Sequence, residues 1–290
     1  MKDACIEKLK KTEIQDLLRA FSSKTWRRLG FCQQFKNEVK TYETTITQNL
    51  IFEMLEFARL TGTPQLRLLE ALDESANGND IEIYVRHGGG YILFPTQAKS
   101  LYPSGKYEKI NHQSGGKFQI HALLEYAAKR QGIPLYLLYN YHPKWQDVVG
   151  WEGELGFEYD CFGCSLVNAH LLEHQYFDAL NFKWIMPGFF DLHPRPAIPL
   201  FRLLDLSWIE ELWKASKKHV PELAVYDYKE VFDEKNWIDH TPPPSISGFP
   251  KDVHFFQGVV ELNVPEFKPK FRLVLSKEKK RGTVTIREIA

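Results

Sequence analysis

Several features that would assign this chain to a specialised class of protein are missing. It has four cysteines in 290 residues, too few for a disulfide framework and suited to a reducing compartment. It has no apolar run of about 18 residues, and its charged N-terminus has no apolar signal core. Lysine plus arginine and aspartate plus glutamate number 37 each, so net charge predicts no bulk attraction to nucleic acid or membrane. We therefore expect a cytoplasmic protein with no membrane partner.

Common catalytic motifs are missing as well. The sequence contains no P-loop, no GxGxxG and no Ser-His-Asp order, and "RHGGGY" at residues 86–91 predicts a hairpin turn because no helix follows it. The composition is that of a globular protein, with 43% hydrophobic and 14% aromatic residues. A chain of 290 residues can bury a substantial core.

The apolar residues follow two periodicities. Helical spacing occurs in residues 3–21, 43–60 and 117–133, whereas residues 80–87, 90–98 and 134–141 have the apolar runs of strands. Helices that alternate with apolar strands predict an α/β layer fold. We expect a mixed β-sheet flanked by helices in residues 41–205, with an N-terminal helical basic segment at 1–40 and a C-terminal extension at 206–290 made of a helix and a β-hairpin.

The N-terminal segment carries cations among aromatic residues. Arg27 and Arg28 lie next to Trp26, in the stretch "SSKTWRRLGF". Cations interleaved with aromatic rings suit a nucleic-acid backbone, so both arginines are candidate substrate contacts. The alternative is an ordinary solvated helix face.

The second strand of the hairpin ends in an unusual way. After the apolar "YILF" it continues into Gln97-Ala98-Lys99, and the side chains of residues 97 and 99 leave the same face of a strand. Asp80 and Glu82 share a face of the neighbouring strand in the same way. A buried lysine without an acidic partner is costly, so a lysine at the end of an apolar strand indicates nearby carboxylates. With Glu43 from the preceding helix, this set could hold Mg²⁺ or Mn²⁺ through carboxylate, amide and carbonyl oxygens.

These residues resemble the PD-(D/E)xK, or restriction-endonuclease-like, nuclease superfamily, in which an acid on an early helix and an acid on one strand precede (D/E/Q)-x-K on the next. The segments "ETTIT", "GNDIEIYV", "QAKSLY", "QIHALLEYA", "PLYLLYNY" and "FGCSLVNA" are similar, in that order, to a bacterial family known as domain of unknown function 6615. The resemblance covers roughly residues 40–200. It implies a restriction-endonuclease-like sheet and, from its bacterial setting, a role in antiviral defence against foreign DNA.

The resemblance also implies roles for individual residues. Glu43 and Asp80 would bind the metal, Gln97 and the backbone carbonyl of Ala98 would complete its ligands, and Lys99 would assist the attacking water. Gln97 replaces the commoner acid, and Glu82 could supply the missing charge. Three further residues are candidate substrate contacts, of which only the first rests on the resemblance: Gln119, Lys106 and Tyr107.

Each of these residues also has a structural interpretation. Asp80 and Glu82 could form a solvated strand end, Lys99 could extend its ammonium to solvent, and Glu43 could be an acid favoured by the helix dipole, with Glu53 as the alternative acid. A second metal-binding pattern combines a CxxC at 161–164 with histidines at 170 and 174, but its spacing is shorter than that of a zinc finger, and we expect no zinc.

The sequence thus predicts a Mg²⁺-dependent or Mn²⁺-dependent nuclease that cleaves nucleic acid, DNA rather than RNA. The alternative is an inactive module of the same fold that binds nucleic acid or a protein partner. The sequence leaves homo-oligomerisation open.

Overall fold

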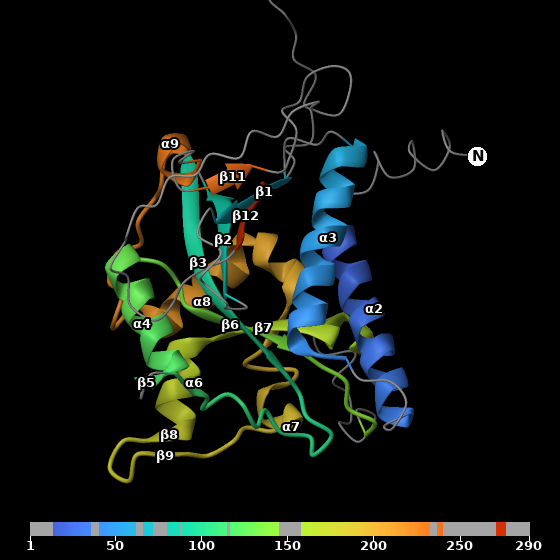
Figure 1. Ribbon diagram of the computed structural model, residues 1–290. Coiled ribbons are helices and arrows are strands. Elements are labelled where there is room, and N and C mark those ends of the chain that lie inside the picture. The colour runs from blue at the N-terminus through green and yellow to red at the C-terminus, as the bar shows by residue number, and fades with distance from the viewer. Residues whose placement is uncertain are drawn as a thin grey trace, which may run out of the picture.

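The computed structural model describes residues 14–35, 41–61, 66–71, 80–87, 89–114, 117–144, 158–232, 237–239 and 271–276. Within these ranges, no helix combines the length and the apolar character that crossing a bilayer requires. A mixed sheet lies between two layers of helices (Figure 1). The predicted α/β class, with a mixed sheet flanked by helices, is therefore confirmed.

The described strands form one sheet of eight strands in the order β10-β7-β6-β3-β2-β12-β1-β11. The neighbours β2–β12 and β3–β6 are parallel, and the other neighbours are antiparallel. Two small additional sheets pair β4 with β5 and β8 with β9. The strands of the main sheet are β1 (Leu66–Ala71), β2 (Asp80–His87), β3 (Gly90–Ser100), β6 (Leu135–Tyr139), β7 (Cys164–Asn168), β10 (Ile198–Pro199), β11 (Trp237–Asp239) and β12 (Phe271–Leu275).

The alternation of side chains along β2 divides the core into two layers. Ile81, Ile83 and Val85 pack on the face covered by α2 (Ile14–Gln34) and α3 (Glu43–Thr61). Tyr84 packs on the opposite face with α4 (Gln119–Arg130) and α6 (Ala169–Tyr176). Figure 1 shows these helix pairs on opposite sides of the sheet. The remaining described helices are η2 (Tyr159–Gly163), α7 (Phe189–Leu192), η3 (Leu200–Leu204), α8 (Leu206–Ser216) and α9 (Tyr228–Val231).

The predicted hairpin of β2 and β3 is confirmed. Its register runs from His87 opposite Gly90 at the turn to Asp80 opposite Gln97 at the far end. Gly90 is required by close packing, since a Cβ atom there would lie 2.5 Å from the carbonyl oxygen of Tyr226. The hairpin thus brings the polar start of β2 beside the polar end of β3.

The N-terminal helix is part of the core. Ile14, Leu18 and Phe21 of α2 are buried in the same cluster as the residues of α3 and β2. The helix also packs closely on η2, where a Cβ atom on Gly163 would lie 1.9 Å from the carbonyl oxygen of Ser22. Residues 1–13 and 36–40 of the expected N-terminal segment lie outside the described residues.

The C-terminal part of the chain contributes to the same sheet. We expected residues 206–290 to form an extension, but β12 lies between β1 and β2, with parallel register from Phe271–Ile81 to Leu275–Val85. The apolar "FRLVL" is buried there on both faces. The expected helix is present as α8, and the first strand of the expected hairpin, "FRLVL", is β12, whereas its expected partner "TVTIREI" lies outside the described residues. The physical reason for the difference is that β12 pairs with β1 and β2, which come from a distant part of the sequence. The residues next to β12 in the chain do not reveal these partners.

Candidate active site at the end of strand β3

The polar end of β3 is buried. Gln97 is 3% exposed and Lys99 is 5% exposed, so neither is a solvated strand end. The strand continues through them because β6 pairs in parallel with β3 up to Ser100 opposite Tyr139. The ammonium of Lys99 donates a hydrogen bond of 2.9 Å to the amide oxygen Oε1 of Gln119, the first residue of α4. The structure thus brings Lys99 and Gln119 together.

The strand register places Asp80 at the same point. Its backbone lies directly opposite Gln97, and residues opposite one another in an antiparallel pair belong to the same face of the sheet. Lys99 follows Gln97 by two residues and therefore shares that face. The side chain of Asp80 lies outside the described part of the structure, so its place rests on the register alone.

Glu43 approaches the same strand from the other helical layer. It is the first residue of α3, and its Oε2 accepts a hydrogen bond of 3.1 Å from the backbone N–H of Ser100. One turn later, the Thr47 hydroxyl lies 2.8 Å from the Tyr139 hydroxyl, which fixes the start of α3 against β6. The acid of the early helix is therefore held next to the end of β3.

The backbone direction of β3 brings Ala98 into the same set. The N–H of Leu101 donates to the carbonyl oxygen of Tyr139 in β6, so the N–H of Ser100 points to the opposite edge, where Glu43 accepts it. Peptide groups alternate in direction along a strand, and the carbonyl of Ala98 therefore leaves on the same side as the N–H of Ser100.

The donor set fits a hard divalent cation. Carboxylate, amide and carbonyl oxygens are the ligands that Mg²⁺ and Mn²⁺ favour. Glu43, Gln97 and Ala98 offer these groups around one strand end, where the backbone of Asp80 lies opposite that of Gln97. Among the described side chains, which exclude that of Asp80, no group of three histidine, cysteine, aspartate or glutamate residues could hold a metal ion. A metal at this place would therefore depend on Asp80 and on the neutral oxygens.

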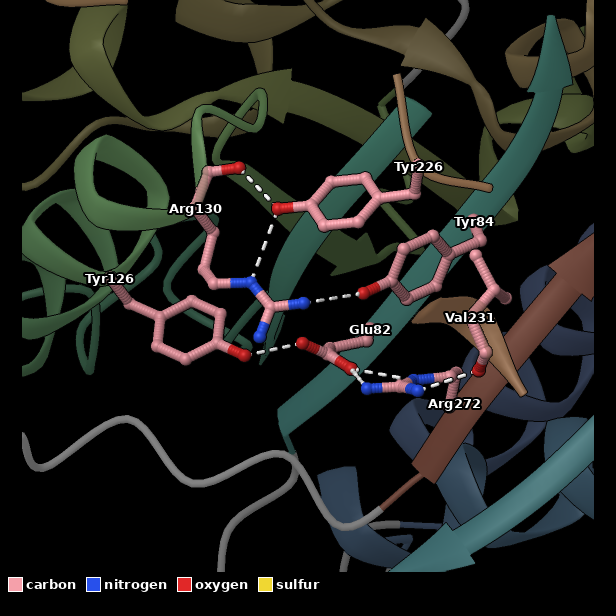
Figure 2. A network of polar contacts seen from close by, with 7 residues as sticks. All are labelled: Glu82, Tyr84, Tyr126, Arg130, Tyr226, Val231 and Arg272. Atoms are coloured by element: carbon pink, nitrogen blue, oxygen red, sulfur yellow. Dashed lines mark hydrogen bonds and ion pairs between the residues drawn. The ribbon is translucent and has the colours of Figure 1, made fainter. Parts of the chain in front are cut away.

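Glu82 is committed to a different interaction. Its carboxylate is fully buried, and Oε2 lies 2.8 Å from Nε and 2.6 Å from Nη2 of Arg272 in β12. The Tyr126 hydroxyl donates to Oε1, and Arg272 also donates to the carbonyl oxygen of Val231 (Figure 2). The possible role of Glu82 as an extra metal ligand is thus corrected: it holds β12 in the sheet as the partner of a buried arginine.

The loop before α4 is also arranged differently from expectation. Tyr107, expected to contact substrate, is fully buried, and its hydroxyl donates a 2.6 Å hydrogen bond to Oδ1 of Asn140. Lys106 is exposed, and its backbone pairs with Gly188. Lys106 therefore remains available to a substrate, whereas the buried Tyr107 anchors the loop to Asn140.

Two cations of α2, Lys24 and Arg27, have acidic partners within the chain. Lys24 forms a 2.5 Å ion pair with Glu53, and Nη2 of Arg27 lies 3.5 Å from Asp160. Arg28 is half-buried on the same helix, and Arg27 stays 78% exposed despite its partner. The structure places the partners of Lys24 and Arg27 on α3 and in η2. It also gives Glu53, the alternative acid, a partner on α2.

The CxxC segment lies in the core. Burial raises the pKa of Cys161 to about 11 and that of Cys164 to about 12, which keeps both as thiols, the form that binds metals weakly. His170 stacks on His219 with ring centroids 4.2 Å apart, and His174 is exposed on the same helix. The described cysteines and histidines form no metal-binding group.

Sequence analysis missed a buried polar network beside the site. Asn140, the residue after β6, donates hydrogen bonds of 2.7 Å to the carbonyl oxygen of Phe162 and 2.9 Å to the hydroxyl of Ser165. That hydroxyl lies 2.8 Å from Nε2 of His193. With Tyr107, these residues connect the end of β6 to β7 and to the loop after α7. The signal that could have revealed the network is the asparagine that follows a fully apolar strand.

Comparison with known proteins identifies the family. A family of unknown function (DUF6615) matches residues 14–280. The chain belongs to this family. The match of the DUF6615 family begins at the first residue of α2 and extends past β12, so both the N-terminal helix and the C-terminal strand fall within it. No curated protein and no solved structure matches the chain.

Proposed function

We propose that this DUF6615 protein is a metal-dependent nuclease of the PD-(D/E)xK, restriction-endonuclease-like type. The observation that carries the proposal is the convergence of four groups at one strand end. Glu43 contacts the backbone of Ser100, Asp80 lies opposite Gln97 in the register, and Lys99 is buried two residues away. A buried ammonium next to oxygen ligands would stabilise the negative charge that develops on a phosphate during hydrolysis.

The residues of the chain would share the work as follows. Glu43, Asp80, Gln97 and the carbonyl of Ala98 would hold Mg²⁺ or Mn²⁺. The metal, when bound, would offset charge on the phosphate oxygens and favour deprotonation of a water. Lys99 would orient the attacking water and stabilise the charge that develops on the phosphate. Gln119 would keep the Lys99 ammonium in place through the 2.9 Å hydrogen bond.

A second candidate function is binding without cleavage. It is favoured by the small number of carboxylates: Gln97 is neutral, and Glu82 is occupied by Arg272 and Tyr126. A site with fewer negative charges binds divalent metal more weakly. In this alternative, the same strand end would contact a phosphate of nucleic acid or a partner protein through Lys99, without hydrolysis.

A cleavage assay distinguishes the two functions. Labelled single-stranded and double-stranded DNA and RNA are incubated with the protein in EDTA, Mg²⁺ or Mn²⁺. The nuclease proposal predicts cleavage with a metal, none in EDTA, and strong loss of cleavage in Asp80→Asn. Binding without cleavage in any of these conditions would support the second candidate.

A further inference from the structure

The β8–β9 hairpin exposes a cluster of large apolar side chains. Its strands are β8 (Phe177–Asp178) and β9 (Lys183–Trp184), and Figure 1 shows it projecting from the body of the protein beyond α6. Leu180 is 93% exposed, Phe182 is 77% exposed and Ile185, just after β9, is 61% exposed. Single exposed apolar residues are common, but three within six positions on one projecting hairpin indicate a binding surface.

The hairpin turn is held in a fixed shape. The carboxylate of Asp178 accepts hydrogen bonds from the backbone N–H groups of Leu180 (3.0 Å) and Asn181 (3.2 Å), and from the side-chain amide of Asn181 (2.6 Å). Phe182 has a φ of 49°, in the left-handed region that side chains with a Cβ atom seldom adopt. The turn therefore holds its apolar residues outward before any ligand arrives, which lowers the entropic cost of binding.

Aromatic rings connect the tip of the hairpin to the candidate active site. Phe182 packs on Phe177 (ring centroids 6.3 Å apart), Phe177 packs on Trp184 (5.2 Å), and Trp184 packs on Phe118 (6.1 Å). Phe118 is the N-cap residue of α4 and directly precedes Gln119, the partner of Lys99. The hairpin thus packs against the start of α4, the helix whose first residue, Gln119, binds the ammonium of Lys99.

The residues that follow β9 pair with the loop that follows β3. The carbonyl oxygen of Pro187 accepts a 3.0 Å hydrogen bond from the N–H of Tyr107, and Gly188 pairs with Lys106. Lys106 and Lys183 are both exposed, one on the site loop and one on the hairpin. Lys183 directly follows the exposed Phe182, and a cation beside an aromatic ring is a combination that binds a phosphate backbone and its unstacked bases.

We propose that the β8–β9 hairpin binds unpaired nucleotides, with Phe182 and Leu180 stacking on or wedging between bases while Lys183 and Lys106 contact phosphates. This inference rests on the proposed nuclease function and specifies its substrate as single-stranded or locally unpaired nucleic acid. An apolar wedge between base steps is a common use of exposed phenylalanine and leucine, and an aromatic ring stacks on any base. A partner protein or a second copy of the chain would also cover an apolar hairpin, but the exposed Lys183 and Lys106 favour nucleic acid.

The test measures affinity without cleavage. The full chain is titrated in EDTA against fluorescent 20-nucleotide single-stranded DNA, the duplex of the same sequence and single-stranded RNA. The variant is Phe182→Ala, and the matched control is Phe52→Ala, which removes an equally large ring that is 63% exposed on α3. We expect Phe182→Ala to weaken binding of the single strands about tenfold and of the duplex less than twofold, with no change in Phe52→Ala.

Each other result would overturn the inference. An equal loss on duplex and single strand would assign Phe182 a general role, and unchanged single-strand affinity or no nucleic-acid binding by the wild type would remove the hairpin from recognition. A wild-type dimer that Phe182→Ala converts to a monomer would assign the hairpin to self-association. Cleavage with metal is measured separately. If the wild type binds single strands through Phe182 but cleaves nothing, the nuclease proposal fails and the hairpin inference stands.

Discussion

Lys99 and Gln119 form a partly buried hydrogen bond of 2.9 Å between the ammonium nitrogen and the amide oxygen. The two residues come from different elements, since Lys99 is the penultimate residue of β3 and Gln119 begins α4. The amide oxygen of Gln119 thereby directs one of the three donors of the ammonium. A long, flexible lysine side chain is thus held in one orientation at the end of the sheet.

The first prediction concerns Gln119 as a positioning residue. Gln119→Leu removes the acceptor and should lower kcat ten- to a hundredfold, with little change in KM, because misplacement of a reacting group costs rate rather than binding. Gln119→Glu keeps an acceptor oxygen and should retain most of the rate. Steady-state cleavage kinetics measure both values. Equal losses in the two variants would show that Gln119 acts in another way.

The second prediction concerns the buried ion pair between Glu82 and Arg272. Arg272→Met leaves a fully buried carboxylate with one charged partner fewer, and should lower the free energy of unfolding by about 3–5 kcal/mol. Urea denaturation measures the loss. The double variant Glu82→Leu/Arg272→Met should be more stable than the single variant, since no buried charge is left unpaired. As a control, Lys24→Met breaks the ion pair with Glu53, in which the lysine side chain is about half exposed. This change should lower the free energy of unfolding by about 1 kcal/mol or less.

The third prediction separates a structural from a recognition role of Tyr107. Tyr107→Phe removes the hydroxyl that donates to Asn140 and leaves a buried amide oxygen without this donor. We expect a loss of about 1–3 kcal/mol in the free energy of unfolding, and unchanged affinity for nucleic acid. Thermal unfolding and fluorescence anisotropy measure the two quantities. A loss of affinity in the folded variant would restore Tyr107 as a substrate contact.

The fourth prediction is a pH dependence that arises from His193. Burial lowers the pKa of His193 to about 4 in the folded protein, whereas an exposed histidine has a pKa of about 6.5. As the pH falls, His193 therefore binds a proton in the unfolded chain before it does so in the folded protein. The resulting contribution to the free energy of unfolding is fully present above pH ~6.5 and is lost as the pH falls toward 4. At pH 5 the loss should be up to about 2 kcal/mol.

The matched variants for this pH dependence are His193→Gln and His112→Gln. Urea denaturation at pH 7 and pH 5 should show a smaller loss in His193→Gln than in the wild type. His112 is exposed, and its replacement should leave the loss unchanged. An identical pH dependence in all three proteins would contradict a buried, neutral His193.

Local patterns in the sequence were sufficient to predict the α/β class and the β2–β3 hairpin. The alternation of Ile81, Ile83 and Val85 and the apolar "YILF" mark both strands, and the glycines between them mark the turn. The position of Lys99 after that apolar run also indicated a buried polar strand end. These features depend on neighbours in the chain, which the sequence displays directly.

Features that depend on distant segments could not be predicted in the same way. Glu82 shares a strand face with Asp80, but its partner Arg272 is 190 residues away in the sequence, and no local pattern reveals that β12 enters the sheet beside β2. Tyr107 stands in a polar loop and yet is buried, and its hydrogen bonds join it to Asn140 and Pro187 in other parts of the chain. The role of each residue is set by tertiary contacts rather than by its own segment.

The measurement that tests the nuclease proposal most directly is the rate of metal-dependent cleavage by Lys99→Met, compared with its affinity for the same DNA in Ca²⁺. Methionine keeps the length and the apolar stem of a side chain that is 5% exposed, and removes only the ammonium. We predict a rate loss of about a hundredfold or more, with affinity changed by only a few-fold because phosphate binding is spread over many contacts. Undiminished cleavage by folded Lys99→Met, or no cleavage by the wild type, would contradict the assignment of this strand end as the active site.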